Sequence, residues 1–140
     1  MAEKSRKPTV TMRYWLALLI VFLSACTASD KAEIHKLLDL RNTAISQKDM
    51  ATYTQLLGKQ YQLSDAGHVI KSMRHMFDNF DQVEMTSRDR RIQLKDDNHA
   101  ICEQTYILRV LSDGQWRKIV QREQLKLRKE NGAWKIISGL

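Results

Sequence analysis

The chain has 140 residues and a net charge of +7, and its composition is 43% hydrophobic and 28% charged. These values are typical of one globular domain and exclude a wholly disordered chain. Four basic residues and one acidic residue among the first 25 positions supply +3 of this charge, which leaves +4 for the rest. That remainder is mild and has no basic stripe or known motif, so a nucleic-acid partner is not expected.

The N-terminus has the layout of a secretory signal peptide over residues 1–25. A basic leader precedes an apolar run from Tyr14 to Ala25, as in signals with a charged region, a short apolar region and small residues at the cleavage point. As a helix, about a dozen residues rise only ~18 Å, less than the ~30 Å hydrocarbon core of a bilayer. A transmembrane helix is therefore not expected. Met12, next to Arg13, is an alternative start of the chain.

The apolar run ends in Leu23-Ser24-Ala25-Cys26, which resembles the bacterial lipobox. The resemblance implies cleavage before Cys26 and lipidation of its thiol, with residues 26–29 as a short lipidated tether. Several acyl chains together give a stable membrane anchor. We therefore expect a lipid-anchored protein of the bacterial cell envelope that faces the periplasm. In the systems that this motif resembles, an aspartate after the cysteine favours retention at the inner membrane, so Thr27 favours the outer membrane.

Two helices are expected after the tether. Asp30 and Glu33 fit a capping box, and apolar residues recur at helical spacing from Ile34 to Ile45. Asp49 is expected to cap a second, shorter helix that Gly58 ends.

The next stretch predicts a small hairpin followed by a third helix. Residues 61–64 and 68–70 are short strand-like pieces around Asp65-Ala66-Gly67, a turn sequence. Ser72 is expected to begin the third helix, which presents an apolar stripe of Met73, Met76, Phe77 and Phe80. A stripe of this kind is usually part of the core.

Four strand-like segments fill the chain from Gln82 to Leu140. The turn sequences between them are Asp96-Asp97-Asn98, Ser112-Asp113-Gly114 and Glu130-Asn131-Gly132. The last two contain Asp-Gly and Asn-Gly pairs, which favour tight hairpins. The segments are rich in β-branched and aromatic residues, as half-buried strands are. We predict a four-stranded antiparallel meander.

This order of elements, with the ending Asn131-Gly132-Ala133-Trp134-Lys135-Ile136, resembles the NTF2-like (SnoaL-like, ketosteroid-isomerase-like) superfamily. The pattern of Arg41, Ala44, Asp49 and Tyr53 is also similar to the first two helices of that family. The resemblance covers residues 30–140. It implies an α+β fold in which a curved antiparallel sheet wraps around three N-terminal helices and forms a cone that can hold a small molecule. It indicates fold much more specifically than function.

Two-residue turns fix an expected register of the sheet. In this register Leu111 pairs with Trp116, Gln104 with Glu123, and Leu125 with Ser138. The face expected to line the interior carries Cys102, Gln104, Tyr106, Leu108, Val110, Ile119, Gln121, Glu123, Leu125, Leu127, Trp134 and Ile136. The basic face carries Arg88, Arg90, Arg109, Lys118, Arg122, Lys126, Arg128 and Lys135.

A band of polar residues crosses the centre of this sheet, where Arg91, Gln104 and Glu123 are expected side by side. Buried polar groups need partners, so the band indicates either an Arg91–Glu123 ion pair without a substrate or a ligand site. The ligand site would comprise Arg91, Gln104, Tyr106, Gln121, Glu123 and Trp134. The candidates for catalysis are Glu123 as proton acceptor and Tyr106 as hydrogen-bond donor.

No metal or cofactor is expected. The four histidines are scattered without the spacing of metal ligands, and Cys26 and Cys102 form no CxxC motif. Cys102 is expected to be a small buried apolar residue. The basic face is expected to be solvated, a homodimer interface, or a contact for anionic lipid or cell-wall polymer, in that order.

Two functions follow as hypotheses. The first is a binding or interaction module without catalysis, whose partner is a small apolar ligand, a second copy of the chain or another envelope protein. The second is a SnoaL-like enzyme of isomerase or hydrolase type that acts on a small apolar substrate in the cone.

Overall fold

The computed structural model describes residues 11–63 and 66–140, and the side chains of residues 27–61 and 68–140. Contacts divide the chain into two units, Met1–Asp30 and Lys31–Leu140. The helices are α1 (Thr11–Ser46), α2 (Met50–Gln55), α3 (Gln60–Leu63) and α4 (Ala66–Asn79). The strands are β1 (Gln82–Leu94), β2 (His99–Ser112), β3 (Gln115–Glu130) and β4 (Ala133–Ser138).

The N-terminal expectations fall largely outside the described side chains. Residues 1–10 and the side chain of Cys26 lie outside them, and the backbone of residues 11–30 is part of α1. Asp30 therefore lies inside a helix that begins at Thr11, and the expected helix start and capping box at Asp30 are wrong. Within the part of the chain that the structure describes, none of the helices has the length and apolar character needed to cross a bilayer.

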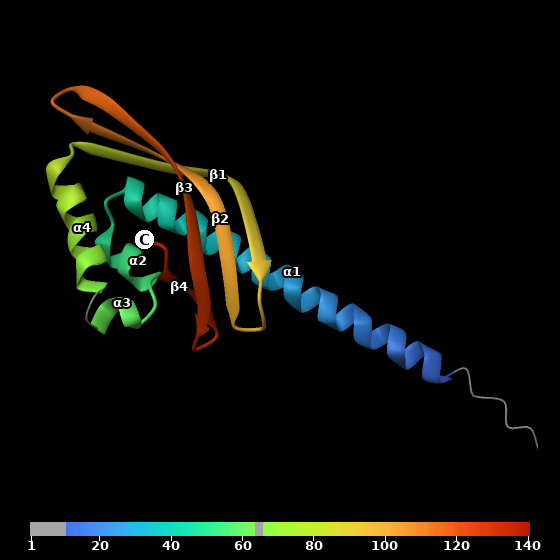
Figure 1. Cartoon of the computed structure of the whole chain (residues 1–140). Helices are drawn as coiled ribbons and strands as arrows, with labels where there is room; N and C mark the ends of the chain where they lie inside the picture. The colour runs from blue at the N-terminus through green and yellow to red at the C-terminus, as the bar shows by residue number, and fades with distance from the viewer. Residues whose placement is uncertain (1–10, 64–65) are drawn as a thin grey trace, which may run out of the picture. The chain divides into compact units, whose positions relative to one another are not determined.

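The predicted antiparallel meander is confirmed. The strands follow the order β1-β2-β3-β4, and Figure 1 shows the sheet curving around the helices of the second unit. In the β2–β3 and β3–β4 turns both central residues have positive φ: Asp113 and Gly114 at 52° and 72°, Asn131 and Gly132 at 50° and 78°. This is the signature of a type I′ turn, whose twist matches that of the flanking strands.

The register is as expected in β2–β3 and differs in β4. Leu111 pairs with Trp116 and Gln104 with Glu123. The expected pairing of Leu125 with Ser138 is wrong, because the register shifts between Lys126 and Leu127 and Ser138 pairs with Lys126. Such a shift adds a residue to one strand and bends it.

The expected hairpin around residues 65–67 is also wrong, because the two predicted strand pieces lie in helices: α3 ends at Leu63 and α4 begins at Ala66. Asp65 itself lies outside the described residues. Val69 and Ile70 extend the apolar stripe of Met73 and Met76 toward the N-terminus at helical spacing, and all four pack against the core. Burial of this continuous stripe overrides the local turn sequence, so α4 begins at Ala66 rather than at Ser72. The described part of the chain therefore has four helices where three were predicted.

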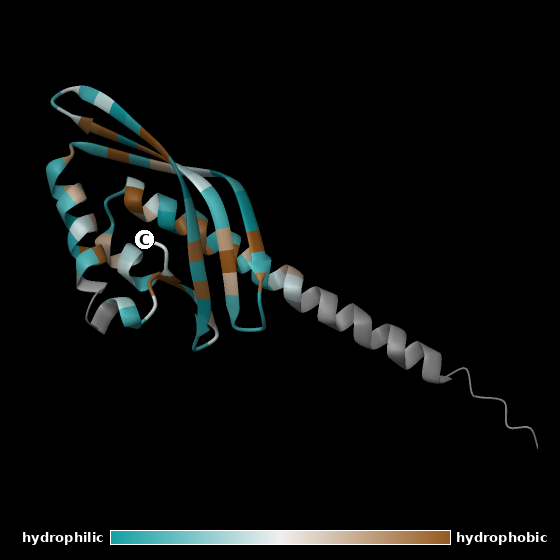
Figure 2. Cartoon of the chain, in the orientation of Figure 1, coloured by the Kyte–Doolittle hydropathy of each residue, from teal (hydrophilic) through white to brown (hydrophobic). Residues whose placement is uncertain are grey.

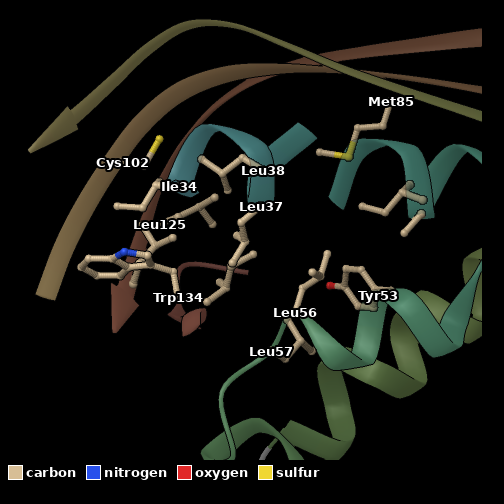
Figure 3. Close-up of a cluster of buried hydrophobic side chains, with 14 of the residues drawn as sticks. Ile34, Leu37, Leu38, Tyr53, Leu56, Leu57, Met85, Cys102, Leu125 and Trp134 are labelled. Atoms are coloured by element: carbon tan, nitrogen blue, oxygen red, sulfur yellow. The ribbon is translucent and has the colours of Figure 1, made fainter. Parts of the chain in front are cut away.

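The core lies between the sheet and the helices of the second unit. In Figure 3, Ile34 and Leu38 of α1 point toward Leu125 and Trp134 of the sheet, and these side chains are at most 4% exposed. Figure 2 shows hydrophobic and hydrophilic positions alternating along the strands, as expected for a sheet with one buried face. Cys102 is fully buried, and burial raises the pKa of its thiol to about 11.

The second helix begins as predicted. The Asp49 carboxylate accepts a hydrogen bond from the Thr52 backbone N–H at 3.0 Å, which identifies Asp49 as the N-cap of α2. The hydrogen bond from the Thr52 hydroxyl, together with this one, lowers the pKa of Asp49.

Candidate functional site

A cavity of about 640 Å³ lies between the sheet and helices α1, α2 and α4. Its walls are mainly apolar, with Met73 and Met76 from α4, Met85 from β1 and Leu108 from β2. The amphipathic α4 supplies one wall because its apolar stripe faces the sheet. A space of this size and character is typical of a site for a small organic molecule.

An ion pair between Arg41 of α1 and Glu123 of β3 forms part of the cavity lining. The two guanidinium nitrogens of Arg41 donate to the two carboxylate oxygens of Glu123 at 2.7 and 3.1 Å. Gln104 donates a further hydrogen bond to Glu123 at 2.6 Å. The side chains of Arg41 and Glu123 are only 6% and 8% exposed. Glu123 is therefore a carboxylate whose negative charge is balanced and whose oxygens accept three bonds.

A second arginine, Arg90 of β1, holds Gln104 in place through a hydrogen bond. Arg90 Nε donates to Gln104 Oε1 at 2.8 Å, and its Nη1 lies 2.9 Å from Asp39 of α1. Arg90 Nη1 also donates to the His35 carbonyl oxygen at 3.1 Å. The amide of Gln104 thus joins Arg90 to Glu123 and holds its orientation.

The expected role of Arg91 in this network is wrong, and Arg90 takes its place. The β1–β2 register shifts between Arg88 and Arg91, and Asp89 has a positive φ of 57°. A bulge of this kind exchanges the faces of the residues that follow it. Arg90, expected on the basic face, therefore points inward, while Arg91 is exposed and pairs in register with Glu103.

Three of the predicted ligand-site residues line the cavity: Tyr106, Gln121 and Glu123. The Tyr106 hydroxyl donates to Gln121 Oε1 at 2.9 Å. Among the described residues the amide nitrogen of Gln121 has no hydrogen-bond partner, so it is a donor available to a ligand. Gln104 contacts Glu123 but is not part of the cavity lining. Trp134 is buried in the core at 4% exposure and does not line the cavity either.

Two residues of the expected interior face, Ile119 and Gln121, are exposed. Ile119 is 47% exposed, because it lies near the free end of the β2–β3 hairpin. The alternation of side chains along β3 predicts which face of the sheet each residue belongs to. It does not predict how far along that face the helices cover the strand.

The sequence interpretation missed Arg41 and Tyr53 as parts of the site. A lone arginine inside the apolar stripe of a helix is the signal that could have identified Arg41. Tyr53 of α2 is fully buried, and neither its hydroxyl nor Arg41 Nε has a hydrogen-bond partner among the residues described. Burial raises the pKa of Tyr53 to about 12, against the opposing effect of the Arg41 charge.

The described side chains contain no group of three His, Cys, Asp or Glu residues that could hold a metal ion. The charged side chains that line the cavity include the Arg41–Glu123 pair and Arg122, which pairs with Glu103.

Comparison with known proteins identifies the fold. The family of calcium/calmodulin-dependent protein kinase II association domains matches residues 30–139. No curated protein matches the chain in sequence.

Solved structures with the same architecture come from several bacteria. One is a protein from Streptomyces avermitilis assigned as a dehydratase of the NTF2-like family, with 14% identity, coverage of 80% of this chain and 94% of that chain, and a TM-score of 0.68. A second, from Xanthomonas campestris, is assigned as a calcium/calmodulin-dependent protein kinase II association domain, with 17% identity, 76% and 82% coverage, and a TM-score of 0.64. A third is the hexachlorocyclohexane dehydrochlorinase LinA-type3 of Novosphingobium barchaimii, with 8% identity, 84% and 94% coverage, and a TM-score of 0.65. At these identities the likeness concerns the fold, which is that of the NTF2-like proteins.

Proposed function

The chain belongs to the calcium/calmodulin-dependent protein kinase II association-domain family, which has the NTF2-like fold, and on that premise we propose that its domain binds a small, mainly apolar molecule in the cavity. The observation that carries this proposal is the cavity of about 640 Å³, whose lining combines methionine and leucine side chains with a few polar ones. Methionine side chains are flexible and adapt to ligands of irregular shape.

The polar groups would orient the ligand. The Gln121 amide is fixed at its oxygen by the Tyr106 hydroxyl, which leaves its N–H groups to donate to a carbonyl or hydroxyl oxygen of the ligand. One such oxygen on an otherwise apolar body is the chemistry that fits this combination.

Binding without catalysis is the better supported of the two functions. A general base needs a free lone pair within reach of the proton it removes. Three of the roughly four acceptor sites of the Glu123 carboxylate are occupied by Arg41 and Gln104. An enzyme using Glu123 and Tyr106 would have to break this ion pair first.

Fluorescence titration with N-phenyl-1-naphthylamine, a neutral apolar probe, tests the proposal. We expect saturable binding to the full-length protein in mild detergent and its loss in Met73→Trp, which fills the cavity from α4. Leu40→Trp is the matched control, because Leu40 is 43% exposed on α1. Equal binding by both variants would place the probe outside the cavity and contradict the proposal.

We also propose that Cys26 carries the lipid anchor of an envelope protein that faces the periplasm, on the support of the Leu23-Ser24-Ala25-Cys26 motif. Metabolic labelling with an alkyne analogue of palmitate in a bacterial host should mark the wild-type protein and the Cys102→Ala control, and leave Cys26→Ala unmarked. Label that persists in Cys26→Ala would refute lipidation at this residue.

A further inference from the structure

The free edge of β3 forms a second surface, which meets the cavity lining at Gln121 and Arg122. β4 pairs with β3 only over Lys126 to Glu130, so among the described residues 115–122 of β3 have no neighbouring strand on that side. All eight of these residues are exposed. Figure 1 shows this part of β3 on the hairpin that it forms with β2, at the upper left of the view. An unpaired edge of this kind is a template for another extended chain.

The register identifies the backbone groups that point to this edge. The Lys129 N–H donates to the carbonyl oxygen of Asn98, just before β2, at 2.9 Å. In an antiparallel pair alternate residues direct their N–H and C=O groups to the same neighbour. The β2–β3 pairing runs without a shift along β3, so odd-numbered residues bond to β2. The even-numbered residues from Trp116 to Arg122 therefore direct their backbone donors and acceptors to the free edge.

The side chains along this edge are apolar and cationic. Trp116, Ile119 and Val120 are 40%, 47% and 49% exposed. The cations are Arg117, Lys118 and Arg122, and Arg109 of β2 stacks on the Trp116 ring at 4.5 Å from its centre. Arg122 pairs with Glu103 at 3.2 Å. Within the described chain, Arg117 and Lys118 have no acidic partner.

We propose that the free edge of β3 binds an acidic, extended peptide segment of a partner protein as an added β-strand. Backbone hydrogen bonds would supply affinity, and the exposed apolar and cationic side chains, which occur on both faces of this edge, would favour a strand that carries apolar and acidic residues. A second copy of this edge fits less well, because Arg117, Lys118 and Arg122 of one copy would face the same three cations of the other and repel them. An anionic lipid surface fits less well because it has no regular row of amides to pair with the open backbone groups.

Fluorescence anisotropy tests this proposal on the full-length protein in mild detergent. The probe is a labelled peptide of alternating glutamate and valine, about ten residues long. Val120→Pro removes one edge-facing N–H without touching the β2 ladder, and proline is tolerated on edge strands. Val120→Thr is the matched control, since it keeps the N–H and the branched shape. We expect Val120→Pro to weaken binding about tenfold and Val120→Thr to change it less than about twofold.

Circular dichroism and thermal unfolding of both variants show whether the fold is intact, and the Pro variant is expected to keep the spectrum of the wild type. Equal affinity of the two variants would overturn strand addition, and so would equal binding of a lysine–valine peptide. Binding to phosphatidylglycerol vesicles in place of the acidic peptide would overturn it in favour of a lipid surface. A dimer that dissociates in Val120→Pro on gel filtration would overturn it in favour of a second copy.

Discussion

Arg41 and Glu123, which are 82 positions apart in the sequence, meet in the wall of the cavity in an ion pair with two hydrogen bonds. The pair ties α1 to β3, and Gln104 extends it across the sheet to β2. A buried pair of this kind is costly to break because removal of one member leaves the other charged and without a partner. The pair thus places in the cavity wall a carboxylate whose two oxygens are already hydrogen-bonded.

We predict that Arg41→Met lowers the free energy of unfolding by about 3 to 5 kcal/mol, because Glu123 is then left as an uncompensated buried charge. The double variant Arg41→Met, Glu123→Leu should recover a large part of this loss. Urea unfolding of the wild type, both single variants and the double variant gives the coupling between the two sites. Additive losses in the double variant would mean that the residues do not stabilise each other.

Arg90 and Arg91 are adjacent in sequence, and the bulge at Asp89 gives them opposite surroundings. Arg90→Ala removes the donor to Gln104 and the partner of Asp39, so it should cost about 1 to 3 kcal/mol of stability. Arg91→Ala, at an exposed position, should change stability by less than about 0.5 kcal/mol. Equal effects in urea unfolding would show that the two residues are not on opposite faces.

Tyr53→Phe should stabilise the domain by about 1 kcal/mol at neutral pH, because it removes a buried hydroxyl that has no partner among the described residues. The pKa of Tyr53 is raised from 10.0 to about 12 by burial. Below pH 10 the phenol is protonated in both the folded and the unfolded state. As pH rises from 10 toward 12 only the unfolded state loses the proton, so stability should fall in this window.

The pH dependence of the midpoint of urea unfolding checks this prediction. The fall in stability between pH 10 and 12 should be smaller in Tyr53→Phe than in the wild type. Part of the fall should remain, because burial also raises the pKa of Tyr61. An unchanged slope would mean that Tyr53 ionises as it does in water.

Gly139 and Gly114 both have positive φ, at 99° and 72°, but only Gly139 is crowded. A Cβ on Gly139 would lie 2.0 Å from the Gln124 carbonyl oxygen, whereas a Cβ on Gly114 meets nothing within 4 Å. Gly114→Ala should therefore cost only the conformational penalty of about 1 kcal/mol and leave probe binding unchanged. Gly139→Ala should displace the C-terminal segment, which lines the cavity, and weaken binding of N-phenyl-1-naphthylamine. Equal affinities in the two variants would show that this segment is no part of the site.

Much of the fold could be predicted because local chemistry determines it. The Asp113-Gly114 and Asn131-Gly132 pairs supply the positive φ of type I′ turns, and these turns set the register of β2 and β3 by counting. The position of Glu123 beside Gln104 followed directly from this count. Asp49 could also be predicted as an N-cap, because this preference depends only on the local sequence.

The rest depends on contacts between segments that are distant in sequence. An aspartate that adopts positive φ within a strand has no sequence signature. The bulge at Asp89 therefore could not be predicted, nor could the inward position of Arg90 in place of Arg91. The α4 helix begins early because its stripe packs against the core, which a turn sequence at residues 65–67 does not reveal. Arg41 was recognised as part of a helix, but its partner lies on a strand whose approach only the folded chain defines.

The most direct test of the cavity proposal is calorimetric titration of two matched ligands, 2-acetylnaphthalene and 2-ethylnaphthalene, into the wild type and Gln121→Leu. The two ligands have nearly the same apolar body, and only the ketone can accept a hydrogen bond from the Gln121 amide. We predict that the wild type binds the ketone about tenfold more tightly and that Gln121→Leu removes this preference while keeping affinity for the hydrocarbon. Binding of neither ligand, or the same preference in both proteins, would contradict the account.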